Sequence, residues 1–240
     1  GMPLSLLAEN LGTSLTMMSL MGIMMVFALS YNMLLGQTGM LSFGHAVYYG
    51  LAGFIAIHAM RTFVADKLPI PLPLVPIVGG LAGLAFGVVF AAVQSDMKRL
   101  LAYSSIENIG IIVTGIGLTI LFHAYGKSLL AAITLTAVLY HCLNHAFFKS
   151  LLFLATGSVL HATRERSLGK LGGLIHRMPW VAWLALVGTL AIAGLPPLNG
   201  FVSEWLLLQA FLFTPTLPQS FVNMLVPVAT AALVLAVALA

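Results

Sequence analysis

This sequence has very little charge. Only 7% of its 240 residues are Asp, Glu, Lys or Arg, and the whole chain contains just six acidic residues. Soluble domains carry roughly 25% charged residues, so this composition excludes an ordinary soluble protein. Hydrophobic residues make up 60% of the chain, and several apolar runs exceed the roughly 18 residues that cross a bilayer. The composition therefore predicts a polytopic helical membrane protein in contact with lipid.

Cysteine is almost absent too. The single residue, Cys142, excludes a disulfide framework and any iron–sulfur cluster held by this chain alone. Dinucleotide-binding, P-loop and zinc-protease patterns are missing, and the start of the chain has no basic region typical of a cleavable signal peptide. We therefore expect no catalytic residue, no bound cofactor and no metal ion. The net charge of +4 comes from loops, which favours membrane orientation over nucleic-acid binding.

The apolar runs predict an all-α transmembrane helical bundle with about seven spans. The sixth run contains the sequence AGLPPLNG, and neither half of this run is long enough to cross a bilayer alone. We interpret it as one discontinuous helix with a break near residues 194–200. The expected spans are approximately 13–35, 40–60, 74–93, 100–122, 128–160, 180–213 and 221–240.

The basic residues of the loops predict how the bundle is oriented. With seven spans, one side of the membrane receives Lys98, Arg99, Arg164, Arg166, Lys170 and Arg177, and the other receives Arg61, Lys67 and Lys127. Cytoplasmic loops carry an excess of Lys and Arg. We therefore expect the N-terminus outside the cell and the C-terminus in the cytoplasm.

Three ionisable residues lie at a strict four-residue spacing in the fifth span, in the sequence YHCLNHAFFKS. They are His141, His145 and Lys149, which share one face of a helix and extend about 12 Å along it. Ionisable groups inside a membrane are costly and mark ion pathways. A lysine can also snorkel to an interface, but two histidines in line with it favour a proton relay. Two histidines without a third ligand argue against a metal site.

Two carboxylates are further candidates for the relay. Glu204 follows the helix break, where exposed backbone groups and water build transporter ion sites, and we expect it to accept protons and to pair electrostatically with Lys149. Glu107 lies two turns into the fourth span. It would either link proton carriers laterally or pair with a basic residue near the cytoplasmic face.

Four polar residues have expected supporting roles. Asn144 would orient His145 or bind water, or it would simply hold two helices together. The loop residues Asp96, Lys98 and Arg99 form either an interfacial anchor or a cluster with a structural or coupling role. Neither alternative is decided by the residues alone.

Residues from about 94 onward resemble the antiporter-like membrane subunits of complex I, Mrp antiporters and membrane-bound hydrogenases. The resemblance rests on QSDMKRLLAYSSIENIG, HCLNHAFFKSLLFLATGSVLH and AGLPPLNGFVSEWLLLQ, and it is strongest with the large proton-translocating subunit of hydrogenase-4 and formate hydrogenlyase. It implies a multi-pass subunit of the cell inner (plasma) membrane with Lys149 as central proton carrier. Redox centres would then belong to other membrane and peripheral subunits of an oxidoreductase complex. Whether the ion is H⁺ or Na⁺ stays open.

The first ninety residues resemble a different family. The string NMLLGQTGMLSFGHAVYYGLAGFIAIH is similar to the permease subunit of branched-chain amino acid ABC transporters. We therefore divide the chain into permease-like helices, residues 1–90, and an antiporter-like proton-channel segment, residues 91–240. This second part resembles a partial second inverted repeat. The alternatives to a proton-translocating subunit are an amino acid permease subunit or a non-functional fusion of the two.

Overall fold

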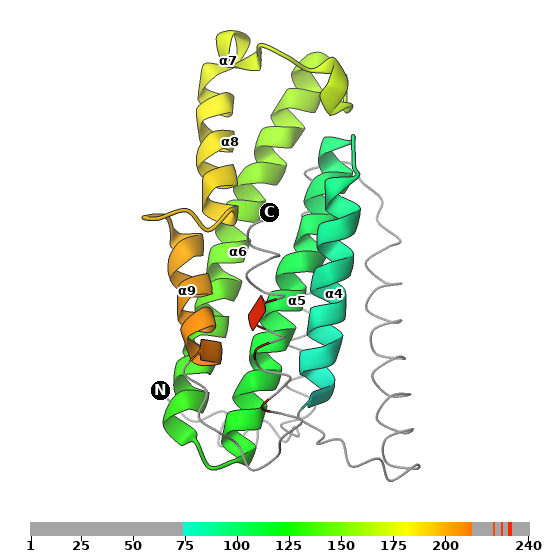
Figure 1. Ribbon diagram of the computed structural model, residues 1–240. Coiled ribbons are helices and arrows are strands. Elements are labelled where there is room, and N and C mark those ends of the chain that lie inside the picture. Colours follow the sequence, from blue (N-terminus) through cyan, green and yellow to red (C-terminus); the bar gives the residue numbers. More distant parts are fainter. Residues whose placement is uncertain (1–73, 213–222, 224–226, 228–229, 232–240) are drawn as a thin grey trace, which may run out of the picture. The chain divides into compact units, whose positions relative to one another are not determined.

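The computed structural model describes residues 74–212 together with 223, 227, 230 and 231. These residues form helices joined by turns and one short 3₁₀ segment, in agreement with the predicted all-α class (Figure 1). The predicted spans 13–35 and 40–60, and nearly all of 221–240, lie outside the described residues. Three described helices are long and apolar enough to cross a membrane: α4 (Leu74–Ala92), α5 (Met97–Ala124) and α6 (Ser128–Thr163).

The break between α4 and α5 is made by polar residues. Asp96 adopts an extended conformation and its carboxylate accepts hydrogen bonds from the backbone N–H groups of Lys98, at 2.8 Å, and Arg99, at 3.2 Å. A side chain that satisfies the free N–H groups of the first turn caps a helix. Helix α5 therefore starts at Met97, three residues before the predicted limit of the span.

Close backbone packing joins α4 to α5. A Cβ atom on Gly80 would lie 2.7 Å from the carbonyl oxygen of Gly110, and a Cβ atom on Gly87 would lie 2.7 Å from the Cα atom of Glu107. Only glycine fits where two helix backbones approach this closely. The buried apolar side chains of this pair, among them Leu84 and Ile111, then pack on either side of the glycines.

Helix α6 is the longest element, with 36 residues. At 1.5 Å per residue it extends about 54 Å, well beyond the roughly 30 Å of a bilayer core. Its C-terminus is capped by Arg164, which adopts a left-handed conformation and donates its backbone N–H to the carbonyl of Leu160. Figure 1 shows α6 between the α4–α5 pair and the two short helices α8 and α9.

The predicted discontinuous helix is present as α8 (Pro179–Ile192) and α9 (Asn199–Leu212). Each has 14 residues, about 21 Å, so neither crosses a bilayer alone. The chain turns between them with Gly194 at φ +61°, and two prolines follow. Gly200 then lies so close to α8 that a Cβ atom there would overlap the carbonyl group of Ala191. The two half-helices therefore meet end to end at a tight break.

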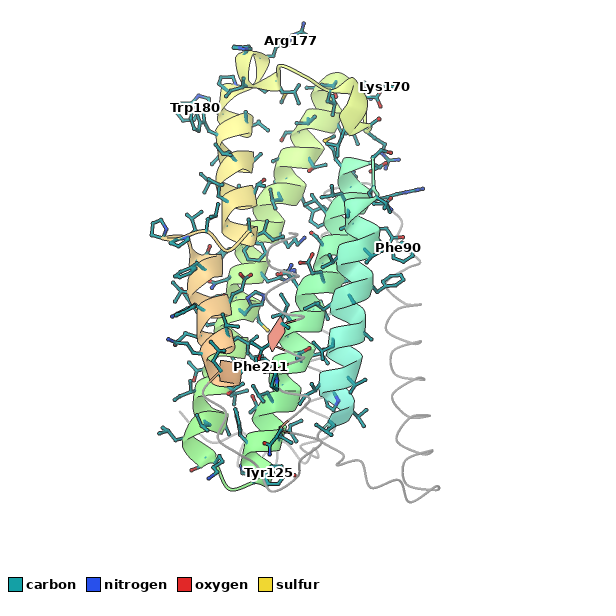
Figure 2. All side chains as sticks on the ribbon, viewed as in Figure 1. Phe90, Tyr125, Lys170, Arg177, Trp180 and Phe211 are labelled. Carbon is teal, nitrogen blue, oxygen red and sulfur yellow. The ribbon has the colours of Figure 1, made fainter. Side chains whose placement is uncertain are left out.

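The basic loop after α6 is attached to the start of α5. The backbone N–H of Met97 donates to the carbonyl of Arg166 at 3.2 Å, and the N–H of Leu168 donates to the carbonyl of Ser95 at 2.8 Å. The 3₁₀ segment η2 (Leu168–Lys170) and the short helix α7 (Leu174–Arg177) follow. Lys170 and Arg177 lie at the opposite end of this bundle from Tyr125 (Figure 2). The described basic loop residues that were predicted to share one side therefore do so.

Candidate functional site

Lys149 lies deep between α5 and α6. Its side chain is 5% exposed, and its Nζ atom donates to the carbonyl oxygen of Leu101 at 3.1 Å and to the hydroxyl of Ser104. A charged ammonium has three N–H donors, so these contacts occupy two of them. Within the described residues no carboxylate lies within 4.0 Å of this ammonium. Lys149 is therefore a buried lysine that does not snorkel.

His141 lies two turns before Lys149 and is 1% exposed. Its Nδ1 atom is 3.0 Å from the hydroxyl oxygen of Ser203 on α9, and its Nε2 atom is 3.2 Å from Oδ1 of Asn108 on α5. The ring thus connects three helices that are separate in sequence. Phe148 packs edge-on against it, with the ring centres 6.5 Å apart.

His145 lies between these two residues on α6 and is partly buried. Its ring meets Phe148 edge-on at 5.5 Å, and its Nε2 atom is buried without a hydrogen-bond partner among the described residues. A buried polar atom normally has a partner in the protein or in water. Among His141, His145 and Lys149, it is therefore Nε2 of His145 to which the described helices supply no hydrogen bond.

Asn144 holds α6 to the first turn of α9. Its Nδ2 group donates to the backbone carbonyl of Asn199 at 2.8 Å and to the hydroxyl of Ser203 at 3.1 Å. Its Oδ1 atom accepts a bond from the side chain of Asn199 at 3.2 Å. These contacts join two helices and do not involve His145, so the observed geometry fits the expectation that Asn144 holds two helices together.

The two carboxylates lie on different helices and interact with different groups. Glu107 on α5 is 2% exposed, and its charge acts on Lys149. Glu204 on α9 is also buried, and the carboxylate of Glu107 acts on it electrostatically. Its Oε2 atom has no hydrogen-bond partner within the described part of the chain.

Glu204 was expected to pair electrostatically with Lys149, and no ion pair between the two is found among the described residues. Glu204 follows Ser203, which contacts His141, and eight residues of helix separate His141 from Lys149, a distance of about 12 Å. The antiparallel course of α9 therefore places Glu204 away from the lysine. On α5, Leu101 and Ser104 contact Lys149 directly, and Glu107 on the same helix acts on it through its charge.

A pocket of about 160 Å³ lies beside the lysine site. It shares Leu101 and Ser104 with the contacts of Lys149, and Glu107 also lines it. The remaining lining is mostly apolar and comes from α4, α5, α6 and α8. A pocket of this size has room for several water molecules, at about 30 Å³ each.

The cluster Asp96, Lys98 and Arg99 lies at the start of α5, far along that helix from His141. Asp96 caps the helix and its carboxylate is 3.9 Å from the guanidinium of Arg166. Lys98 is buried, whereas Arg99 is exposed. Asp96 thus contacts both the first turn of α5 and the loop after α6. Glu107 lies deeper in the bundle, where its charge acts on Lys149.

Four residues of this junction were not recognised in the sequence: Ser104, Asn108, Asn199 and Ser203. Ser104 and Asn108 are four residues apart, as are Asn199 and Ser203. His141, His145 and Lys149 on α6 have the same spacing, and residues four apart share a helix face. Applied to every apolar helix, that rule would have identified them.

Comparison of the sequence with known proteins identifies the family of this chain. Residues 43–217 match the family model described as NADH:quinone oxidoreductase/Mrp antiporter, TM. Over 162 residues the chain is 39% identical to hydrogenase-4 component B of Escherichia coli (strain K12), covering 68% of this chain and 24% of that protein. It is 40% identical to formate hydrogenlyase subunit 3 of the same organism, covering 68% of this chain and 26% of that protein. The chain thus spans about a quarter of the length of these relatives.

Solved structures agree with these matches. The chain is similar to a chain of the Mrp complex from Dietzia sp. DQ12-45-1b, with a TM-score of 0.58 and 33% identity, over 70% of this chain and 17% of that one. It is also similar to a chain of the membrane-bound sulfane sulfur reductase, an archaeal respiratory membrane complex, with a TM-score of 0.57 and 30% identity, over 70% of this chain and 24% of that one. The comparisons do not support the permease resemblance, since the family match already begins at residue 43.

Proposed function

Because this chain belongs to the NADH:quinone oxidoreductase/Mrp antiporter transmembrane family, we propose that it translocates protons as a membrane subunit of a hydrogenase-like or NADH dehydrogenase-like redox complex. Its relatives include components of a hydrogenase and of a formate hydrogenlyase. Electron transfer would take place on other membrane and peripheral subunits. This chain would supply the path for the protons.

The observation that carries the proposal is the buried Lys149 with Glu107 on the neighbouring helix. A charge inside a membrane costs several kcal/mol on most scales, so a lysine at this depth needs a reason to be there. Its contacts with a hydroxyl and a carbonyl suit both a charged ammonium and a neutral amine. The proton of Lys149 can therefore be gained and lost without breaking an ion pair.

The proposed route uses the five ionisable groups between α5, α6 and α9. His141 and His145 exchange protons with water near one end, Lys149 holds the central proton, and Glu107 links it electrostatically to Glu204. A change of charge at one of these groups changes the proton affinity of the next, which is a coupling free energy between sites. The pocket beside Ser104 and Glu107 is the proposed path by which water reaches the lysine.

Lys149→Arg is the sharpest test in the complete complex. Arginine keeps a buried cation but does not release its proton in proteins, so we expect proton translocation in membrane vesicles to stop. Electron transfer, measured in the same vesicles, should continue. Lys149→Ala should behave alike, and the exposed Lys127→Ala is the matched control. Undiminished translocation by Lys149→Arg would refute the proposal.

We propose H⁺ rather than Na⁺ as the ion. Transporter sodium sites use oxygen ligands such as the carbonyls of unwound helices, whereas the proposed route passes through an ammonium group and two imidazole rings as well as two carboxylates. Translocation should therefore be the same at micromolar and at millimolar Na⁺. A rate that rises with the Na⁺ concentration would assign sodium instead.

We also propose that the basic end of the bundle, with Arg177 and Lys170, faces the cytoplasm. An accessible cysteine introduced at Arg177 in a Cys142→Ala background should react with an impermeant maleimide only in inside-out vesicles. A cysteine at Lys127 should react only in right-side-out vesicles. The reverse pattern would invert the predicted orientation.

We propose the division between residues 1–90 and 91–240 because the first part resembles a permease and the second an antiporter-like subunit. The family match spans this boundary, and no described residue favours an amino acid permease. Genomic reads across the codons for residues 86–94 test whether the two parts are encoded as one chain. Leucine uptake with an ATPase partner would be needed to support the permease alternative.

A further inference from the structure

The side chain of Asn108 has one orientation that fits its surroundings. Its Nδ2 group lies 2.9 Å from the carbonyl oxygen of Ser104, and a carbonyl only accepts hydrogen bonds, so the amide nitrogen must face it. The Oδ1 atom consequently faces Nε2 of His141. Because an amide oxygen has no hydrogen to donate, Nε2 must carry the hydrogen of this contact.

The opposite side of the His141 ring faces a hydroxyl that has a choice of acceptors. Ser203 Oγ is 3.0 Å from Nδ1 of His141 and 3.0 Å from the carbonyl oxygen of Gly200. It also accepts a hydrogen bond from Asn144 at 3.1 Å. A hydroxyl has one hydrogen, so it can donate to Nδ1 or to the Gly200 carbonyl, but not fully to both.

We propose that Asn108 and Ser203 are positioning residues that restrict proton exchange at His141 to Nδ1, and that the Ser203 hydroxyl reverses with each exchange. In the neutral state Nε2–H donates to Asn108 and the Ser203 hydroxyl donates to Nδ1. When Nδ1 takes a proton from a hydronium ion, one O–H bond of that ion breaks, one N–H bond forms, a water molecule is left and the ring becomes positive. Nδ1–H then donates to Ser203 Oγ, and the hydroxyl turns to the Gly200 carbonyl. Release returns the proton to water and restores the first pattern.

This inference rests on the proposed function, in which His141 is a relay group, and it gives the relay a direction. The hydrogen on Nε2 stays with Asn108, so His141 does not hand it to α5. Exchange occurs on the α9 side, next to the helix break. The charge of His141 thereby decides whether the hydroxyl holds the first turn of α9 through Gly200.

The ionisable neighbours of His141 come from all three helices that surround it. Glu107 lies next to Asn108 on α5, His145 and Lys149 lie on α6, and Glu204 follows Ser203 on α9. Each of them can change the fraction of His141 that is protonated. None of them alters which ring nitrogen donates to Asn108, because the positions of the hydrogen-bond donors and acceptors alone determine this contact.

Nitrogen-15 solid-state NMR of the complete complex in lipid tests the tautomer directly. With histidines labelled, the signal lost in His141→Gln identifies this ring. We expect Nε2 protonated and Nδ1 unprotonated in the neutral state. Asn108→Leu, which removes the acceptor at similar volume, should give a mixture of tautomers. A neutral His141 with its hydrogen on Nδ1 in the wild-type complex would overturn the inference.

Proton translocation tests the hydroxyl. Ser203→Ala should reduce translocation by on the order of tenfold or more, as for loss of a proton-transfer group, whereas Ser203→Thr keeps a hydroxyl and should stay near the wild-type rate. Ser158→Ala, which removes an exposed hydroxyl of α6, is the matched control. Wild-type translocation by Ser203→Ala would refute the role of the hydroxyl.

The experiments distinguish a failure of the proposed proton translocation from a failure of the roles proposed for Asn108 and Ser203. If Lys149→Arg stops translocation but Ser203→Ala does not affect it, only the inference about Ser203 falls. If Lys149→Arg translocates normally, the proposed function falls, while the NMR tautomer still reports on Asn108. If Ser203→Ala does not assemble, the chemical shift of the unprotonated Nδ1 in the wild-type complex decides the matter. A neutral His141 whose Nδ1 accepts no hydrogen bond would refute the role of the hydroxyl.

Discussion

The α4–α5 pair and the junction of α5, α6 and α9 hold helices together in opposite ways. In the first, glycines let two backbones touch, and the contacts are almost wholly apolar. In the second, amide, hydroxyl and imidazole groups form hydrogen bonds across the helices. Because α5 takes part in both, the same helix presents a tightly packed face and a polar face.

The difference shows which region is built for stability. Hydrogen bonds between membrane helices contribute on average only about 0.6 kcal/mol each, whereas close packing needs no buried charge. The bundle could therefore be held by packing alone. Burial of the ionisable residues Glu107, His141 and Lys149 costs free energy, and a purely structural junction would not need them. Their presence therefore favours a function.

The largest effect is expected from overpacking the glycine contact. Gly80→Val should destabilise the protein by about 3 kcal/mol or more, because a Cβ atom there meets the backbone of Thr114 and Gly110. Gly79→Val adds the same atoms one residue away, where nothing lies within 4 Å. Thermal unfolding in detergent should separate the two variants clearly. Equal melting temperatures would show that α4 and α5 are not packed in this way.

Removal of a buried charge should separate function from stability. Glu107→Gln should lower proton translocation by on the order of tenfold, because the charge that acts on Lys149 is lost. The melting temperature should stay unchanged or rise, since functional sites are often less stable than they could be. Glu165→Gln, at the exposed loop, is the control for translocation. A stability loss that matches the loss of translocation would make Glu107 a structural residue.

Asn144→Leu should weaken the polar junction by a smaller amount, about 1 to 2 kcal/mol. The substitution leaves the side chain of Asn199 and the hydroxyl of Ser203 without one partner each. Gln94→Leu removes an exposed amide that bonds only the carbonyl of Phe90 at the end of α4, and it should have almost no effect. Cysteine cross-linking between α6 and α9 would measure the loosening. Unchanged cross-linking in Asn144→Leu would mean that packing alone positions α9.

The smallest effect is expected at the solvent-exposed end of the bundle. Backbone N–H groups of Ser167 and Arg166 donate to the carboxylate of Glu165 and lower its pKa below the usual value of 4.5, with a further contribution from Lys170. A depressed pKa stabilises the loop above the unfolded-state value, and this stabilisation is lost as the pH falls through the lower folded-state value.

Hydrogen exchange in this loop is the corresponding measurement. The amides of Arg166 and Ser167 should exchange faster, relative to their intrinsic rates, below about pH 4. Glu165→Gln should remove this pH dependence and leave the junction around Lys149 unaffected. A pH dependence that persists in Glu165→Gln would assign it to another group.

Much of the fold followed from the sequence because apolar length and polar breaks are local properties. The expected spans 74–93 and 128–160 agree closely with α4 and α6, and AGLPPLNG correctly marked the break between α8 and α9. The membrane family was also recognised from its motifs, whereas the permease resemblance of residues 1–90 gains no support from the comparisons. The role of each residue in the relay stays a prediction.

The partners of the ionisable residues could not be read in the same way. Glu204 was expected to pair electrostatically with Lys149, yet the lysine contacts Leu101 and Ser104 and Glu107 acts on its charge. Which residues meet depends on how far one helix is shifted along another. The contacts of His141 with Asn108 and Ser203 join positions 33 and 62 residues apart in sequence. No local spacing carries that information.

The stretch from His141 to Lys149 shows what helix periodicity determines and what depends on the neighbouring helices. Its four-residue spacing by itself determined that three ionisable groups lie along one face of a membrane helix, because helix periodicity is fixed by backbone geometry. Only the tertiary structure decided that Lys149 contacts Ser104, that His141 bridges α5 and α9, and that Nε2 of His145 has no hydrogen-bond partner among the described residues. Those differences arise because the neighbouring helices, not α6 itself, supply the donors and acceptors at each level of the membrane.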